Sequence, residues 1–326
     1  MQWFVCTYFA DMSMGGVYQP LIFIEGIPLS FYIAQLSDFC VMGFAFCSGY
    51  AQMSLYTESD SQRLFYMRRI KSLCGLMINY WIVLVVFNLV SCLIGNANQM
   101  PGDFLTFIRN VFFDPTYNGA WWYMYAYIFI VLVSPVLLKI VQKWNIGYVI
   151  VLGGVMYVLS YFIRFHLDNA GWILSKVGPV GMTVAEYLVG AVFFQYQILS
   201  RIYKYWKKLP GITQGVASVI LVVGMLWMRT KIVPSLFIAP ITGIVIIVLF
   251  HFWKKPKWIE KIFLFVGKHS TNIWLTHMFF YLTLFVNLVY IVKYPFLIFI
   301  FMMGITIVVS IGIQFIQKKI FKLIRY

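Results

Sequence analysis

Long apolar stretches recur along the 326-residue chain, and short polar or basic connectors separate them. A helix needs about 20 apolar residues to cross the roughly 30 Å hydrocarbon core of a bilayer. The pattern therefore predicts an all-α, polytopic transmembrane helical bundle that forms one domain over residues 1–326. The nine predicted full spans cover residues 31–56, 72–94, 121–141, 146–163, 179–199, 212–228, 234–252, 267–292 and 294–316.

The first ten residues are apolar but too short to cross a bilayer alone. We interpret residues 1–10 as a partial N-terminal helix, the outer half of a helix whose inner half is absent. A complete version would then contain ten helices and have both ends on the same side of the membrane.

The composition excludes a soluble domain. The chain is 62% hydrophobic and 11% charged, whereas soluble domains contain about 25% charged residues. Its net charge of +15 could suggest nucleic acid, but the basic residues lie at the ends of the apolar segments. Anionic lipid and the insertion machinery favour that placement, so we expect membrane lipid and no nucleic acid as a partner. The five cysteines show no paired metal spacing, and we expect no metal site.

The basic residues also predict an orientation, because cytoplasmic loops collect Lys and Arg. If the segment between the first two spans is cytoplasmic, every later loop is fixed by alternation. Nineteen of the 25 lysines and arginines then lie inside, and the C-terminus is cytoplasmic.

The ionisable residues within predicted spans include Asp38, Glu186 and His277. Each costs about 2.5 to 3.5 kcal/mol on insertion scales, so each is a candidate for a functional site. The alternative is that these groups only bond to neighbouring helices and hold the bundle together. His277 stands out because a histidine can exchange a proton near neutral pH.

Polar residues precede His277 at helical spacing. Lys268, Asn272 and Thr276 are spaced by four and share one helix face. His269 and His277 belong to the neighbouring row. The basic end of this predicted helix therefore directs a polar stripe into the protein.

Two connectors contain further candidates. The basic cluster Arg68, Arg69 and Lys71 is either an ordinary topology signal or a phosphate-binding site, because guanidinium groups bind phosphate bidentately. The external loop at 95–120 contains Asp103 and other polar residues that could contact a polar acceptor, but it is equally consistent with a plain loop.

Three blocks resemble the membrane-bound acyltransferase 3 family of multi-span bacterial enzymes. Residues 39–50 (FCVMGFAFCSGY) are similar to an apolar run that ends in a Ser-Gly-aromatic element. Residues 65–83 (FYMRRIKSLCGLMINYWIV) resemble a basic turn before an aromatic-containing helix. Residues 265–280 (FVGKHSTNIWLTHMFF) resemble the family's C-terminal Gly-Lys-x-Ser…Leu-x-His block, which is the most specific of the three.

The resemblance implies a multi-pass protein of the bacterial cytoplasmic (inner) membrane that transfers an acyl group, usually acetyl, from acyl-CoA to a hydroxyl of a surface carbohydrate. Acyl-CoA would be a co-substrate, and no permanently bound cofactor is expected. Lys71 stands where the family's Arg-x-x-Arg pattern has its second arginine. We take His277, Glu186 and Asp38 as candidate catalytic residues, and Arg68, Arg69, Lys71 and Lys268 as candidate donor-binding residues.

The chain departs from the family pattern in its first helix. The family's usual base is a histidine there, whereas this chain has no histidine before His166, and Tyr8 stands nearest to that position. An inactive, truncated acyltransferase is therefore one alternative function. A lipid-linked sugar transporter or flippase is another, because it would also be polytopic and basic inside.

Overall fold

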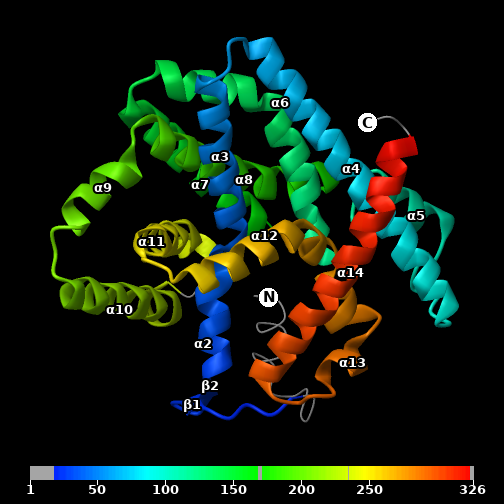
Figure 1. Cartoon of the computed structure of the whole chain (residues 1–326). Helices are drawn as coiled ribbons and strands as arrows, with labels where there is room; N and C mark the ends of the chain where they lie inside the picture. The colour runs from blue at the N-terminus through cyan, green and yellow to red at the C-terminus, as the bar shows by residue number, and fades with distance from the viewer. Residues whose placement is uncertain (1–17, 168–170, 234, 324–326) are drawn as a thin grey trace. The chain divides into compact units, whose positions relative to one another are not determined.

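The computed structural model describes residues 18–167, 171–233 and 235–323, with Asp38 described by its backbone alone. These residues are almost entirely helical, which confirms the all-α prediction (Figure 1). Seven helices of the described chain are long and apolar enough to cross a membrane, and a shorter apolar helix covers Leu236–Phe252. The predicted half-helix at 1–10 and Tyr8 lie outside the described residues.

The chain forms two compact units. The described part of the first covers residues 18–34, 72–124 and 254–323. It begins with the two-stranded hairpin β1 (Phe23–Ile24) and β2 (Ile27–Pro28), which leads into α2 (Leu29–Leu36). Its other elements are most of α4 (Gln62–Leu93), α5 (Phe104–Val111), η2 (Gly119–Trp121), α12 (Lys257–Met278), the π-helix η5 (Phe279–Thr283), α13 (Val286–Tyr290) and α14 (Pro295–Leu323). Within this unit α12 packs against α14 (Figure 1).

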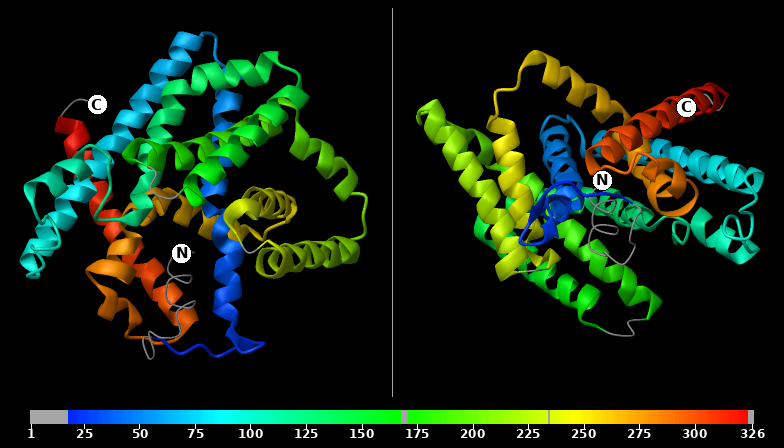
Figure 2. Two further views of the ribbon diagram at one scale, coloured as in Figure 1. Left: turned by 180° about the vertical axis from the view of Figure 1, so that it is seen from behind. Right: turned by 90° about the horizontal axis from the view of Figure 1, so that it is seen from below.

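The second unit covers residues 35–71 and 125–253. Its centre is α8 (Trp172–Gln195), which packs against α3 (Cys40–Thr57) and α7 (Ile146–Phe165) (Figure 2). The remaining elements are η1 (Ser37–Phe39), the start of α4, most of α6 (Trp122–Lys143), α9 (Ile198–Trp206), α10 (Gly211–Trp227), the π-helix η3 (Met228–Ile232), η4 (Leu236–Ile238) and α11 (Ala239–Phe252).

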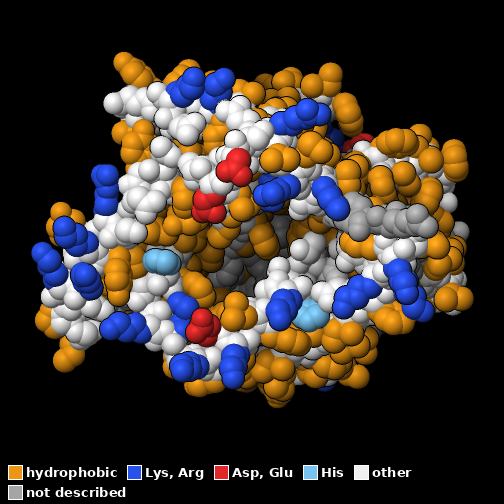
Figure 3. All heavy atoms as spheres, turned by 45° about the horizontal axis from the view of Figure 1, so that its top comes forward, with side chains coloured by type: hydrophobic (Ala, Val, Ile, Leu, Met, Phe, Trp, Pro, Cys, Tyr) orange, Lys and Arg blue, Asp and Glu red, His pale blue; other side chains and the backbone are white. Residues whose placement is uncertain are grey.

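The outer surfaces of the helices are apolar, as a lipid environment requires. Val151 of α7 is 63% exposed and Ile220 of α10 is 64% exposed. Contiguous apolar surface of this kind would promote aggregation in water, but it is the normal surface of a helix in lipid. Figure 3 shows apolar side chains over much of one face, where Lys and Arg are far more frequent than Asp and Glu.

Two glycines allow α3 and α8 to approach closely. A Cβ atom on Gly49 would overlap the carbonyl oxygen of Tyr187, and a Cβ on Gly190 would overlap that of Phe46. Small residues let helix backbones meet, and packing of this kind holds membrane helices together where the hydrophobic effect between helices is absent. The Ser-Gly-aromatic element at 48–50 therefore has a structural role at this interface.

We predict that Gly190→Ala destabilises the protein by about 1–3 kcal/mol, because overpacking forces the two backbones apart. The measurement is the thermal unfolding midpoint of the detergent-purified protein. Gly154→Ala is the matched control, since a Cβ there meets nothing within 4 Å. Equal midpoints for the two variants would contradict the proposed close packing.

Several predicted boundaries are wrong. The helix α4 begins at Gln62 rather than at residue 72, so the basic cluster is helical and does not lie in a loop. The helix α8 begins at Trp172 and includes Pro179 in its interior. The predicted external loop at 95–120 contains the helix α5.

The predicted span at 267–292 is also incorrect. Its helix, α12, begins at Lys257 and ends at Met278, after which η5 and the short α13 follow. The first turn of α12 contains Glu260. The charged residues there favour the polar membrane surface, so this helix begins before the apolar segment does.

Candidate active site

His277 lies at the last turn of α12 and is 7% exposed. Its Nδ1 atom is 2.7 Å from the carbonyl oxygen of Trp274. A carbonyl oxygen can only accept a hydrogen bond, so Nδ1 carries the proton and Nε2 of the neutral ring keeps its lone pair. The ring of Tyr281, at 5.7 Å between ring centroids, lies beside the imidazole. This arrangement fixes the ring and leaves Nε2 able to accept a proton.

The end of α12 is held by side chains from the residues before α6. The backbone N–H of Phe279 donates to the carbonyl oxygens of His277 and Thr276. The carbonyl oxygen of Leu275 is therefore available to other donors. Trp121 Nε1 donates to it at 2.8 Å, and Asn118 Nδ2 donates at 3.0 Å. The last turn of α12, which contains His277, is therefore held by two side-chain hydrogen bonds.

A buried polar network at Asn272 and His269, which precede His277 on α12, joins this helix to α4 and α14. Asn79 Nδ2 donates to Asn272 Oδ1 at 2.6 Å, and Asn272 Nδ2 donates to Ser310 Oγ at 3.1 Å. Ser310 Oγ lies 2.9 Å from His269 Nδ1. Gln314 Nε2 lies 3.4 Å from the same nitrogen, and an amide N–H can only donate. His269 Nδ1 therefore accepts, and the hydrogen bonds run in one direction from Asn79 to His269.

We predict that Ser310→Ala lowers the free energy of unfolding by about 1–2 kcal/mol, because it leaves the Asn272 amide and the His269 ring without their shared partner. Thermal unfolding in detergent is the measurement. Ser218→Ala is the control, since Ser218 donates to the Gln214 carbonyl of its own helix and takes no part in the network. A Ser310 variant as stable as the Ser218 variant would show that the network contributes nothing.

The predicted donor-binding residues differ in their exposure. Arg68 and Lys71 are exposed on α4, whereas Arg69 is partly buried. The guanidinium of Arg69 lies 5.9 Å from the centre of the Phe65 ring. Its Nε atom is buried and has no hydrogen-bond partner among the described residues. A buried cationic donor without a partner is costly, so Arg69 is the member of the cluster that is best placed to hold an anion.

Hydroxyl and amide groups lie near Arg69 in the same unit. Tyr127 of α6 bonds to Ser48 of α3, and Tyr187 Oη of α8 donates to Gln52 Oε1 at 3.1 Å. Both tyrosines lie within electrostatic reach of Arg69. The polar groups of α3, α4, α6 and α8 therefore gather beside the basic cluster.

Glu186 is buried on α8, one residue before Tyr187. It lies within electrostatic reach of Arg164, near the end of α7. A Cβ atom on Gly178 would overlap the backbone of Arg164, so α7 and α8 are in close contact there. Ionisable residues within a membrane usually lie near a group of opposite charge, and Arg164 is such a group for Glu186.

The other two predicted residues contribute less. Lys268 is exposed on α12, and its carbonyl oxygen accepts a hydrogen bond from Gln314. It lies nine residues before His277, about 14 Å away along a helix axis. Asp38 lies in η1, directly before α3, and its side chain is outside the described part of the structure.

The structure thus divides the predicted residues between the two units. His277 and Lys268 belong to the first unit, and Asp38, Arg68, Arg69, Lys71 and Glu186 belong to the second. No group of three His, Cys, Asp or Glu side chains within the described ranges is placed to hold a metal ion.

The sequence interpretation overlooked two residues of these clusters. Ser310 follows Thr306 by four positions on the apolar α14, and Gln314 follows by four more. This spacing places three polar residues on one helix face, and it could have identified the side that packs on α12. The interaction between Arg164 and Glu186 has no local signature in the sequence, because it depends on the packing of α7 on α8.

Comparison with known proteins identifies the family to which this chain belongs. The profile of a family described as "acyltransferase domain" matches residues 10–315, which is nearly the whole chain. No curated protein and no solved structure matches the chain. The described part of the chain contains seven helices that are long and apolar enough to cross a bilayer, so this is a multi-pass membrane protein. Because the match covers nearly all of the sequence, this chain belongs to the acyltransferase 3 family.

Proposed function

We propose that this acyltransferase transfers an acyl group, most simply acetyl, from acyl-CoA to a hydroxyl of a cell-surface carbohydrate. The acceptor would be a sugar of a capsule, an exopolysaccharide or a lipopolysaccharide, and the membrane would be the bacterial cytoplasmic membrane. The observation that carries the proposal is the environment of His277, where the Trp274 carbonyl fixes the ring and leaves the Nε2 lone pair available. O-acylation requires a base of this kind.

The reaction assigns one role to His277. Its Nε2 atom takes the proton of the acceptor hydroxyl as the hydroxyl oxygen attacks the thioester carbonyl carbon. The tetrahedral intermediate then collapses, the carbon–sulfur bond breaks, and the coenzyme A sulfur takes the proton from the imidazolium. The products are the O-acyl sugar and free coenzyme A. Glu186 has a cationic neighbour in Arg164, so we assign the base role to His277 alone.

The basic residues would bind the donor. Coenzyme A contains several phosphate oxygens, and guanidinium groups bind such oxygens through paired hydrogen bonds. Arg69 offers a buried Nε donor without a partner among the described residues, and Arg68 and Lys71 add positive charge beside it. The predicted orientation, with the C-terminus in the cytoplasm, places this cluster and Lys268 on the side where acyl-CoA is available.

The proposal is tested with the purified chain in phospholipid vesicles, acetyl-CoA labelled in the acetyl group, and extracted surface glycan. We expect alkali-labile label on the glycan and an equal amount of free coenzyme A, because an O-acetyl ester is cleaved by mild base. Binding of a lipid-linked sugar with no release of coenzyme A would favour a transporter and would contradict the proposal.

A further inference from the structure

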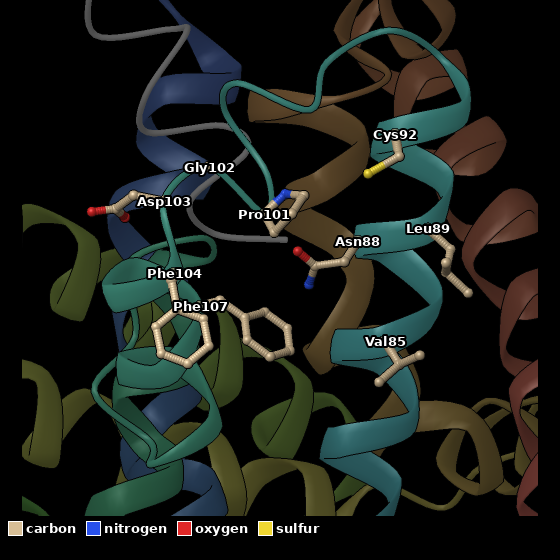
Figure 4. Close-up of a pocket in the computed structure, with 9 residues that line it drawn as sticks. All are labelled: Val85, Asn88, Leu89, Cys92, Pro101, Gly102, Asp103, Phe104 and Phe107. Atoms are coloured by element: carbon tan, nitrogen blue, oxygen red, sulfur yellow. The ribbon is translucent and has the colours of Figure 1, made fainter.

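A cavity of about 480 Å³ lies between the last turns of α4 and the segment that leads into α5. Its size is within the range of small-molecule pockets. Figure 4 shows Val85, Asn88 and Cys92 along α4, with Pro101, Phe104 and Phe107 opposite. All of these residues belong to one unit of the structure, and none of them belongs to the site described above.

Asn88 is the polar feature of this cavity. It is 7% exposed, and its Nδ2 atom donates to the Leu84 carbonyl at 2.6 Å. Its Oδ1 atom is buried and has no hydrogen-bond partner among the described residues. In Figure 4 the amide is directed from α4 toward Pro101. A buried acceptor that lacks a donor costs free energy, so a ligand that supplies a hydroxyl or N–H would be favoured here.

The polarity of the cavity changes along α4. Among the lining residues of α4, Val85 lies farthest from the end of the helix. The rings of Phe104 and Phe107 lie across the cavity from it (Figure 4). Asn88 follows one turn later, and Cys92 and Asp103 lie nearest the end of α4. Hydrogen bonds from the Thr106 side chain and from its backbone N–H, at 2.9 Å for the latter, lower the pKa of the Asp103 carboxyl. The lining is thus mostly apolar, with a single buried acceptor in the middle at Asn88, and the Asp103 carboxylate points away from it (Figure 4).

We propose that this cavity binds the acceptor as a lipid-anchored sugar, with its hydrocarbon chain against Val85, Phe104 and Phe107 and a headgroup hydroxyl donating to Asn88 Oδ1. The inference rests on the proposed function, and it specifies the acceptor as an amphiphile. A free sugar would leave the apolar end unused, and a plain hydrocarbon chain would leave Asn88 without a donor. In the predicted orientation this cavity lies at the outer end of α4, with Val85 toward the middle of the span.

Cys92 offers a reporter, since it lines the cavity and its thiol is free and exposed. The test uses the full chain in phospholipid nanodiscs, with the other four cysteines changed to serine. The rate of Cys92 alkylation by a small maleimide is measured with octyl β-glucoside below its micelle concentration, with glucose, and with 1-octanol. We expect octyl glucoside to slow the alkylation of Cys92 more than glucose or 1-octanol does at the same concentration.

Asn88→Leu keeps the apolar wall and removes the Oδ1 acceptor, and it also removes the Nδ2 donor to the Leu84 carbonyl, so the thermal unfolding midpoint of the variant is measured alongside. In this variant octyl glucoside should bind about fivefold more weakly, which corresponds to the loss of one hydrogen bond. Phe107→Ala should weaken the binding of octyl glucoside and the binding of 1-octanol by similar factors. Equal protection by 1-octanol, equal protection by glucose, or no protection by any probe would each overturn the proposal.

The protection assay contains no acyl-CoA, so it separates the two proposals. Protection without acyl transfer would retain the binding site and reject the proposed enzyme activity. Acyl transfer without protection would retain the activity and reject this cavity as the acceptor site.

Discussion

Replacement of His277 by glutamine is expected to lower the rate constant for acyl transfer by about 10²–10⁴-fold, the usual contribution of a positioned general base. The variant keeps a polar side chain at the end of α12 but has no basic nitrogen. The Michaelis constant for acyl-CoA should be unchanged, because the base acts on the acceptor hydroxyl and does not hold the donor. Steady-state kinetics with labelled acetyl-CoA measure both quantities.

His166→Gln is the matched control for this prediction. His166 is exposed and follows the last residue of α7, so its loss should leave the rate unchanged. A His277→Gln variant that transfers acyl groups at the rate of the His166 variant would remove His277 from the reaction. A higher Michaelis constant for acyl-CoA with an unchanged rate constant would instead reassign His277 to donor binding.

Arg69→Gln is expected to weaken coenzyme A binding by about 10- to 100-fold, which corresponds to the loss of one hydrogen bond between charged groups. The reason is the inward position of this side chain, whose buried Nε has no partner within the described part of the chain. Isothermal titration of the detergent-purified protein with coenzyme A measures the affinity. The 3′-dephospho form of coenzyme A shows which phosphate Arg69 contacts.

Arg63→Gln is the control, because Arg63 belongs to the same helix and is exposed. An exposed cation contributes only a screened attraction, so its loss should change the affinity little. If the two variants bind coenzyme A equally well, the donor phosphates lie elsewhere and the basic cluster is a topology signal alone.

The fold class was predictable because membrane burial imposes long apolar segments on the sequence. Boundaries were less predictable where helices extend beyond the hydrocarbon. The start of α4 at Gln62 and the start of α12 at Lys257 lie in basic segments. Such segments remain helical at the membrane surface although their composition resembles that of a connector. Hydropathy marks the apolar part of a helix and misses its polar extension.

The candidate site was predictable as far as residue type and spacing allow. The stripe on α12 was expected, and Asn272, Thr276, His269 and His277 are all buried. Lys268, on the same predicted face, is exposed. The bond between His269 and Ser310 was not predictable, because it depends on the packing of α12 on α14. For the same reason only the packed structure separates the inward Arg69 from the exposed Arg68.

The most direct test of an O-acyltransferase function compares the surface glycans of cells with and without the gene by mass spectrometry. The proposed function predicts that glycans from cells with the gene carry one additional acyl-sized mass increment per modified sugar, and that mild alkali removes it. Glycans of identical mass in the two strains, with the protein present in the membrane, would contradict it.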